Sequence, residues 1–528
     1  MPVTPTYPGV YVEEVPSGVR TITGVATSIA AFVGRAERGP VNKATAITSF
    51  ADFERVFGGL TSLSRMGFAV RDFFANGGTQ AVVVRLYRPP GGANPKTKAK
   101  ITSNNLTVNA ADEGAWGNAL RIRIDTDVSE DVATSWGLAK ADLFNLSVRD
   151  TETGATEVHR NVTMKESPRQ VDRVTANESK LIRADLPATM PTAHGALPTP
   201  TTDPWSSDAL SAGVAAADKG GDGQLLNDDS FIDPANEAKK QGLYALENAD
   251  LFNILCIPPY KSGDTVDVTV VGKAAEYCEK RRAILLVDPR DWADKDAVIA
   301  ALANPGANVG TRGKNAALFF PRLRQPNPLL DNAVEPFAPC GAVAGVLART
   351  DADRGVWKSP AGMDATLRGV ADVSATLTDL EIGQLNPLGV NCLRVIQGLG
   401  PVVWGARTLQ GDDRFASEWK YLSVRRTALF IEESLFRGTQ WVVFEPNDEP
   451  LWAQIRLNIG TFMHSLFRQG AFAGSSPRDA YLVKCDHETT TQDDVNRGVV
   501  NVVVGFAPLK PAEFVIIKIQ QLAGRLAS

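Results

Sequence analysis

The sequence predicts a multidomain α+β or mixed α/β protein with a β-rich insertion and extended ends. The chain has 528 residues, 44% hydrophobic and 22% charged, which is ordinary globular composition with room for three or four domains of about 150 residues. Short continuous apolar runs alternate with helical patterns in its first and last parts, as in a sheet covered on both faces. Between them, polar and apolar residues alternate, which is typical of a half-exposed antiparallel sheet.

Residues 21–90 predict the first part of the covered sheet. The apolar run 29–34 predicts a buried strand. A helix follows over 50–57, with its phenylalanines on one face and glycines after it, and a second helix follows over 66–75, with Met66, Val70, Phe73 and Phe74 facing inward. The run 81–86 is the next buried strand, so the order strand, helix, helix, strand indicates α/β packing.

The two ends of the chain predict extended arms at 1–20 and 511–528. Four prolines in the first segment exclude a central strand of its own sheet, although Val10–Val12 is β-prone. The second segment carries the β-prone run 514–519 beyond Pro508 and Pro511. A terminal strand set apart by prolines invites pairing with another chain.

Residues 91–339 are expected to form inserted outer domains. Period-two patterns at 120–124 and 144–148 predict antiparallel strands. The stretch 187–229 has too little apolar content for a core and predicts a long polar loop. A second α/β pattern begins near residue 251, with two buried strands joined by a crossover helix at 273–282.

Residues 340–510 predict a C-terminal core domain. Asn447 and Asp448 can cap a helix whose apolar residues recur at helical spacing until Gly470. Strand candidates follow at 481–484 and 499–506.

Composition excludes several classes of partner. The formal charge of −5 gives no positive field for a polyanion, so no nucleic acid partner is expected. The five cysteines, Cys256, Cys278, Cys340, Cys392 and Cys485, are scattered and fit neither a disulfide framework nor a zinc site. No apolar run approaches the ~18 residues of a bilayer span, and the start lacks an export signal. A soluble chain without stable membrane insertion is expected.

The sequence contains no recognisable motif for catalysis or cofactor binding. Gly398 and Gly400 lack the third glycine of the dinucleotide fingerprint, since residue 403 is valine. The four histidines lie outside hydrolase and metalloprotease motifs. The polar cluster Cys485–Glu488 with Asp493 and Asp494 has the spacing of a solvated loop and not of a metal site. We therefore predict no catalytic, cofactor-binding or metal-ligating residue.

Several strings, read in order, resemble those of the contractile tail sheath proteins of phages and related injection machines. They lie at 8–14 (PGVYVEE), 30–34, 38–40, 76–85, 113–118, 144–150, 341–345 (GAVAG), 350–362 (TDADRGVWKSPAG), 386–387, 431–434, 441–447 and 507–514 (APLKPAEF). The resemblance covers nearly the whole chain. The main departure from the family is the polar stretch 187–229.

The resemblance implies a structural subunit that stacks as hexameric rings around an inner tube and contracts without nucleotide. The sheath core would combine 21–90 with 340–510. The N-terminal arm would pair through Gly9, Val10, Tyr11, Val12 and Glu13, and the C-terminal arm through Phe514, Val515, Ile516, Ile517 and Ile519. The strands that receive them would carry Tyr481, Val483, Val500, Val502 and Val504.

A third contact is expected with the inner tube. Lys420, Arg425 and Arg426 precede an apolar run, and a helix would turn Lys420 and Arg425 away from Leu422 and Leu429. These cations could line the inner wall, or they could be an ordinary solvated helix face.

Other partners implied are the baseplate and the tail terminator or cap proteins, with assembly in the bacterial cytoplasm. The particle would be a phage tail virion or a released phage-tail-like particle. The alternatives are a baseplate or other structural component of the same particle, or a soluble α/β enzyme. Self-association into tubes separates these readings, because enzymes form small closed oligomers.

Overall fold

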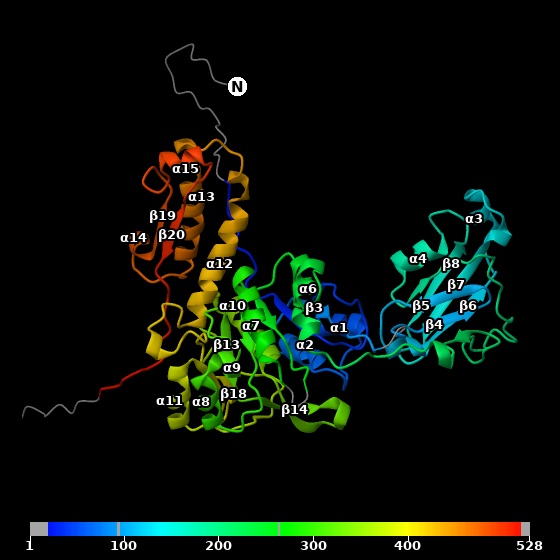
Figure 1. The fold of residues 1–528 in the computed structure, drawn as a ribbon, viewed down its shortest axis with the longest axis horizontal. Coiled ribbons are helices and arrows are strands. Elements are labelled where there is room, and N and C mark those ends of the chain that lie inside the picture. Colours follow the sequence, from blue (N-terminus) through cyan, green and yellow to red (C-terminus); the bar gives the residue numbers. More distant parts are fainter. Residues whose placement is uncertain (1–19, 92–94, 262–264, 519–528) are drawn as a thin grey trace, which may run out of the picture.

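The computed structural model describes residues 20–91, 95–261 and 265–518. Within them the chain forms three parts (Figure 1). A central α/β domain carries the largest sheet, an outer region of β-structure lies to one side of it, and a module of two long helices with a small sheet lies on the other. The mixed α/β class predicted from the sequence is confirmed.

The central sheet has eight strands in the order β18-β17-β13-β12-β11-β1-β3-β2. Six of them run parallel, and the edge strands β2 and β18 pair antiparallel. The strands are β1 (Ala30–Gly34), β2 (Thr45–Ile47), β3 (Ala81–Arg85), β11 (Ile254–Cys256), β12 (Ile284–Val287), β13 (Ala316–Phe320), β17 (Val390–Ile396) and β18 (Gly400–Val403).

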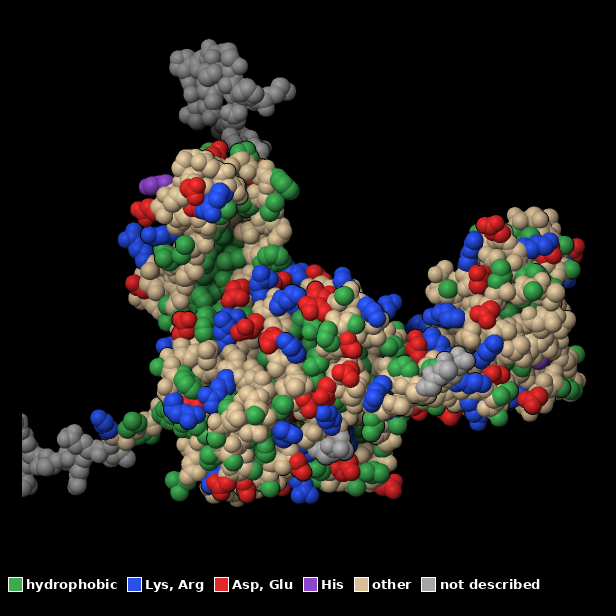
Figure 2. Space-filling view, in the orientation of Figure 1, with side chains coloured by type: hydrophobic (Ala, Val, Ile, Leu, Met, Phe, Trp, Pro, Cys, Tyr) green, Lys and Arg blue, Asp and Glu red, His purple; other side chains and the backbone are tan. Residues whose placement is uncertain are grey.

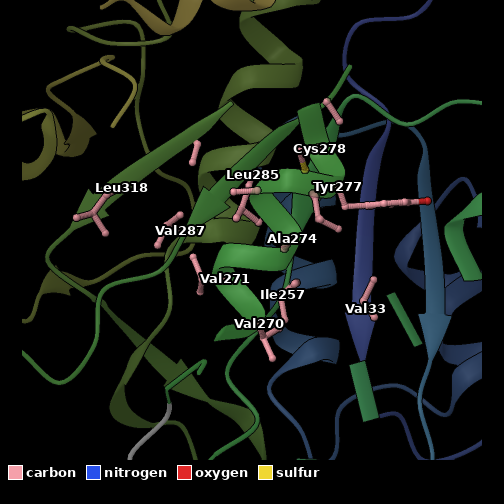
Figure 3. Close-up of a cluster of buried hydrophobic side chains, with 14 of the residues drawn as sticks. Val33, Ile257, Val270, Val271, Ala274, Tyr277, Cys278, Leu285, Val287 and Leu318 are labelled. Atoms are coloured by element: carbon pink, nitrogen blue, oxygen red, sulfur yellow. The ribbon is translucent and has the colours of Figure 1, made fainter. Parts of the chain in front are cut away.

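Helices cover both faces of this sheet, so the inner strands are continuous apolar runs. One core cluster includes α7 (Val268–Lys280) and α8 (Lys295–Ala303), and Figure 3 shows Val270, Val271, Ala274 and Tyr277 of α7 beside Leu285 and Val287 of β12. The other cluster includes three helices: α1 (Phe50–Phe57), α2 (Met66–Ala75) and α10 (Cys340–Arg354).

The remaining elements of the central domain are short. Near the first core cluster the helices are α5 (Asp228–Ile232), α6 (Pro234–Lys239), α9 (Pro305–Asn308) and α11 (Asp379–Leu385). A three-stranded sheet consists of β14 (Leu323–Asn327), β15 (Ala333–Phe337) and β16 (Asp372–Val373).

The helix signals in the first ninety residues are confirmed. Ser49 caps α1 by accepting a hydrogen bond from Asp52 N at 3.1 Å, and Gly58 ends the helix with φ of 93°, which favours glycine. In α2, Met66, Val70 and Phe73 are buried and Phe74 is half-buried.

The string GAVAG at 341–345 lies in α10, where it crosses α2. A Cβ atom added at Gly341 would lie 2.1 Å from the carbonyl oxygen of Ala69, and one at Gly345 would lie 2.5 Å from that of Phe73. The two helices therefore approach more closely than larger residues permit.

The division predicted at residue 339 differs from the structure. Strands β11, β12 and β13 were assigned to the inserted outer part, yet they pair between β1 and β17 in the central sheet. The reason is that parallel neighbours need crossover connections, so the chain must return to the same sheet after the insertion. The insertion seen in the structure extends only from β4 to β10.

The outer region contains two antiparallel sheets, and the alternation predicted at 120–124 and 144–148 is confirmed. The four-stranded sheet has the order β10-β6-β7-β8 and the three-stranded one β4-β5-β9. The elements are β4 (Lys100–Ser103), β5 (Leu106–Ala110), β6 (Leu120–Asp125), α3 (Glu130–Ser135), β7 (Leu143–Asp150), β8 (Thr156–Thr163), α4 (Val171–Glu178), β9 (Ile182–Ala184) and β10 (Ala212–Gly213).

The polar stretch 187–229 is largely irregular, as predicted, but it is held against the outer region. Arg121 of β6 donates to Asp208 at 2.7 Å and to Ser211 Oγ at 2.9 Å, and Arg123 donates to the carbonyl of Leu210 at 2.6 Å. These contacts hold the irregular segment beside β6, at the edge of the sheet where β10 is added.

A buried arginine joins the outer region to the central domain. The guanidinium of Arg85, at the end of β3, donates to the carbonyls of Ala36 (3.0 Å), Gly39 (2.7 Å) and Glu113 (2.7 Å). Because its donors are met by backbone oxygens on both sides of the junction, Arg85 restricts the orientation of the outer region.

The third part is the C-terminal module. It consists of α12 (Leu422–Gly438), α13 (Glu449–Arg468), α14 (Pro477–Ala480), β19 (Tyr481–Lys484), α15 (Gln492–Asn496) and β20 (Val503–Phe506). The predicted cap of α13 is confirmed, since Asp448 accepts a hydrogen bond from Leu451 N at 3.2 Å. Within the described parts of the chain, no helix combines the length and apolarity needed to cross a bilayer.

Asp288 lies at the carboxyl end of β12, and the Oδ2 atom of its carboxyl is buried. Its Oδ1 accepts a hydrogen bond from Cys340 N, in the first turn of α10, at 2.9 Å, whereas Oδ2 has no hydrogen-bond partner within the described residues. Burial raises the pKa of this carboxyl to about 7, so the folded protein favours its neutral form.

We expect Asp288→Asn to stabilise the subunit at pH 8 but not at pH 4. Because the pKa is raised on folding, the native protein loses stability as the pH rises from about 4 through about 7, and a neutral amide avoids this loss. The gain at pH 8 should be about 2–4 kcal/mol. Denaturant unfolding at both pH values measures it, with the exposed Asp291→Asn as control. A gain of equal size at pH 4 would contradict this account.

Candidate inter-subunit surface

The C-terminal module contains a sheet of only two strands within the described residues. β19 and β20 pair antiparallel, with Tyr481 opposite Phe506 and Lys484 opposite Val503. A two-stranded sheet is marginal by itself, and here it is supported on one face by α13. Each strand is paired along one edge only, so the other edges present backbone groups to a further strand.

The predicted receiving residues lie together in this sheet or directly before it. Tyr481, Val483 and Val504 point to the half-buried face that packs on the module core, whereas Leu482 and Val503 point outward. Val500 and Val502 precede β20, which begins at Val503 and is shorter than the predicted strand 499–506.

A hollow lined by apolar side chains runs beside the small sheet. Figure 2 shows these side chains as a green band between β20 and α12. The half-buried apolar residues of the module include Phe430 and Leu435 of α12, Phe467 of α13, and Val504 and Phe506 of β20. A contiguous apolar surface of this kind often marks a site of interaction with another protein.

Beyond Glu513, the described part of the C-terminal arm forms no strand pairing with its own subunit. Residues 511–518 form no helix or strand, and the side chains of Phe514, Val515, Ile516 and Ile517 are 74–82% exposed. Four consecutive large apolar residues in solvent are unusual in a stable monomer. Ile519 lies outside the described residues.

The N-terminal arm residues Gly9–Glu13 also lie outside the described residues, but the root of the arm is visible. Arg20 N donates to Asn458 Oδ1 of α13 at 3.1 Å, and Val25 N donates to Ser434 Oγ of α12 at 3.2 Å. Ile22 is buried in the core of the module. The chain therefore passes along both long helices before it enters β1.

The structure contradicts the expected tube contact at Lys420, Arg425 and Arg426. The two arginines are buried within the subunit. Arg425 Nε donates to Asn315 Oδ1 at 3.0 Å, and Lys420 lies 2.6 Å from Asp413. Charged side chains were expected to avoid the core, but buried charges are accommodated when each one is paired.

The Arg426 pair shows the principle most clearly. Its guanidinium donates to both carboxylate oxygens of Asp351 at 2.8 and 2.6 Å, and both side chains are 3% exposed. A further donor reaches the carbonyl of Thr27, whose hydroxyl donates to Asp351 at 2.7 Å. The pair joins α12, α10 and the N-terminal root. Its partners are separated by 75 residues, so no local spacing could have identified it.

The cysteines and the clusters of acidic and histidine side chains are the candidate metal ligands in the described residues. All five cysteines are buried as free thiols, and burial raises the pKa of the Cys485 thiol to about 11, which disfavours the thiolate that metals bind. In the ranges 20–91, 95–261 and 265–518, no group of three or more His, Cys, Asp or Glu side chains could hold a metal ion.

The usual ligand position of an α/β sheet is filled by the chain itself. Ligands bind beyond the carboxyl ends of parallel strands where the winding direction reverses, which is between β1 and β11 here. Arg35 donates to the carbonyl of Asp222 and Tyr87 to that of Gly221, both at 2.7 Å. The ring of Phe231 lies 4.4 Å from that of Tyr260. The segment returning from the outer region thus occupies this position.

In the described residues, the C-terminal module thus has a two-stranded sheet with unpaired edges, and an exposed apolar run follows it at 514–517. Comparison with known proteins agrees. The phage tail sheath protein central domain matches residues 234–409, and the phage tail sheath C-terminal domain matches residues 416–521. A prophage major tail sheath protein of Pseudomonas aeruginosa is 26% identical over 293 residues, which cover 52% of this chain and 67% of the relative.

Two solved assemblies share the fold. The sheath complex of an extracellular contractile injection system in its contracted state has a TM-score of 0.57 at 21% identity, covering 98% of each chain. A chain of the anti-feeding prophage baseplate has a TM-score of 0.57 at 21% identity, covering 98% of this chain and 99% of its own.

The chain belongs to the phage tail sheath protein family, since the two matched domains together span more than half of it. It is a sheath protein of a contractile tail or injection system. Members of this family are structural proteins and not enzymes.

We expect Asp351→Ala to destabilise the subunit by about 3 kcal/mol, because it leaves Arg426 buried without its counter-charge. Asp353→Ala, at an exposed position of the same helix, is the matched control and should change the free energy of unfolding by less than about 0.5 kcal/mol. Denaturant unfolding measures both. Equal effects of the two substitutions would show that the buried pair contributes nothing specific.

Proposed function

We propose that this chain polymerises into a sheath of stacked hexameric rings around an inner tube, and that neighbouring subunits are linked by exchanged terminal strands. The observation that carries the proposal combines two features of the described residues: a two-stranded sheet with free edges, and the exposed apolar run 514–517, which forms no strand with its own subunit. A strand added from a neighbour satisfies both at once, since it pairs the edge and buries the apolar side chains.

The position of the free arm favours pairing with a second copy of the chain over pairing within the same chain. Glu513 is held at the central domain, and the free arm begins after it, away from β20. The residues beyond Glu513 are long enough for a strand of ordinary length. Heterologous contacts of this kind continue from copy to copy and generate rings or helical tubes.

Contraction in this proposal uses conformational energy and no nucleotide. The filled position between β1 and β11 supports this, because the chain's own segment 221–231 lies where a nucleotide would bind in a related α/β sheet. The contracted state would bury more surface between subunits than the extended one, and the arms would keep neighbours connected during the change.

The remaining partners in this proposal are the inner tube protein, the baseplate and the terminator or cap at the far end. Arg425 and Arg426 make no tube contact in this proposal, because both are buried within the subunit. Assembly takes place in the bacterial cytoplasm. The outer region, with its irregular segment 187–229, faces outward from the sheath, and the inner wall comes from the opposite side of the subunit.

We expect Val515→Lys combined with Ile517→Lys to abolish tube formation and leave a folded subunit. Both side chains are exposed in the free subunit, so the melting temperature should stay unchanged, whereas an added strand would have to bury two charges. Leu329→Lys with Leu330→Lys, at two exposed apolar positions of the β14–β15 turn, is the matched control.

Sedimentation and negative-stain electron microscopy measure assembly of these variants. Deletion of residues 514–528 should have the same effect as the double lysine variant, and so should deletion of residues 1–19. Normal tubes from the chain lacking 514–528 would disprove the arm exchange.

The outward position of 187–229 is tested with trypsin. Lys219 is the only lysine or arginine between 187 and 229, and it is exposed. We expect assembled particles to be cut after Lys219 and to stay assembled, because Lys219 is exposed and the outer region faces away from the tube in this proposal. Lys219→Gln removes the site and is the control. Complete protection of Lys219 in particles, with cleavage in the free subunit, would place this loop in an interface.

A further inference from the structure

The string APLKPAEF at 507–514 ends in a buried ionic contact that the family resemblance does not explain. Arg407 Nε donates to Glu513 Oε1 at 2.8 Å and Arg407 Nη2 donates to Glu513 Oε2 at 2.6 Å. The arginine side chain is fully buried and that of Glu513 is 15% exposed. This bidentate pair is the strongest geometry available to a carboxylate and a guanidinium.

Arg407 is also held by hydrogen bonds that do not involve Glu513. Its backbone N donates to Asn391 Oδ1 of β17 at 2.6 Å, and its backbone carbonyl accepts from Asn391 Nδ2 at 2.8 Å. Nη1 donates to the carbonyl of Asn386 at 2.9 Å and to Asp413 Oδ1 at 3.1 Å. Hydrogen bonds and the charge of Glu513 outweigh the effect of burial and raise the pKa of Arg407. The socket is therefore rigid, positive and shaped for one carboxylate.

A second contact closes the socket from the side. The hydroxyl of Tyr421 donates to Glu513 Oε2 at 3.2 Å, and Lys420 Nζ lies 3.9 Å from the same oxygen. Lys420 also pairs with Asp413, so one connected network surrounds Glu513. Lys420, one of the three cations expected to face the tube, thus belongs to this network.

The segment before Glu513 is a strap between two parts of the subunit. At its start, Ala507 N donates to the carbonyl of Ala480 at 2.8 Å and its own carbonyl accepts from Ala473 N at 2.9 Å, which holds it in the C-terminal module. At its end, Glu513 is held in the central domain. Pro508 and Pro511 stiffen the stretch between. Residues 509–514 border a cavity of about 1000 Å³ that is also lined by Trp357, Lys358 and Trp404.

We propose that Glu513 is the anchor of the C-terminal arm: its ion pair with Arg407 fixes the point and direction at which the free arm leaves the subunit. Without it, the free arm would begin near Pro508 and gain the length of the strap. This inference rests on the proposed function, because the anchor matters for assembly only when the arm pairs with a neighbour. Glu513 is a positioning residue and makes no inter-subunit contact itself.

The anchor can be tested in the free subunit, where assembly plays no part. The native cysteines in the described residues are all buried, so cysteines introduced at Val515 and at the exposed Leu380 of α11 can be labelled selectively with spin labels. We expect a narrow distance distribution in the otherwise native chain and a broad one after Glu513→Gln. Glu418→Gln, at an exposed glutamate nearby, is the control and should keep the narrow distribution.

Assembly then tests the consequence. Glu513→Gln leaves residues 514–528 intact, and we expect its critical concentration for tube formation to rise about tenfold or more. Tyr421→Phe removes only the hydroxyl donor and should broaden the distances less. If Glu513→Gln does not fold, the Tyr421→Phe distances decide: a distribution identical to the native one overturns the anchor.

The two proposals fail in different ways. If deletion of 514–528 leaves tubes intact, arm exchange is wrong whatever Glu513 does. If that deletion blocks assembly while Glu513→Gln shows native distances and native critical concentration, the anchor alone is wrong.

Discussion

A parallel sheet covered on both faces is the constraint on which the rest of the subunit depends. Parallel neighbours need crossover connections, so the chain must leave the sheet and return after each strand. The longest connection joins β3 to β11, and it contains the whole outer region. The last departure follows β18, and the C-terminal module is built there. Because both parts are excursions from one sheet, their roots lie on a common rigid support.

The same sheet shows how the chain fills the position at which α/β folds commonly bind ligands. The crevice between β1 and β11 is where such sheets bind ligands, but the segment returning from the outer region lies across it. The insertion therefore has two structural consequences: it adds an outer region, and its return path fills the position of a ligand. Arg35 and Tyr87 hold that path through backbone carbonyls, which any sequence supplies, and so the motif strings alone do not reveal it.

Local patterns in the sequence predicted the elements well and their partners poorly. Helices α1, α2 and α13 follow from caps, glycine stops and apolar spacing, which act over a few residues. The assignment of 251–339 to the insertion failed because strand order is a long-range property that a continuous apolar run does not encode. The tube contact failed for a related reason. Arg425 and Arg426 look like a solvated face until Asn315 and Asp351, far away in the sequence, are placed beside them. The strand candidates at 481–484 and 499–506 and the β-prone C-terminal run could be predicted, by contrast, because proline spacing and β-propensity are local.

In the proposed assembly, the two arms are anchored in different parts of the same rigid subunit. The N-terminal root lies along α12 and α13, whereas the C-terminal arm is held at Arg407 in the central domain. The Arg426–Asp351 pair and the 507–513 strap connect these two bodies, so they cannot turn independently without breaking buried ionic contacts. If neighbours are joined through both arms, each connection then depends on the orientation of the whole subunit, because the central domain and the C-terminal module turn together. In the proposed assembly, strand pairing between subunits would be repeated and individually modest, whereas the internal ionic contacts are few and costly to break. A rearrangement of the sheath would therefore be expected to change the contacts between rigid subunits first and to leave the fold of each subunit unchanged.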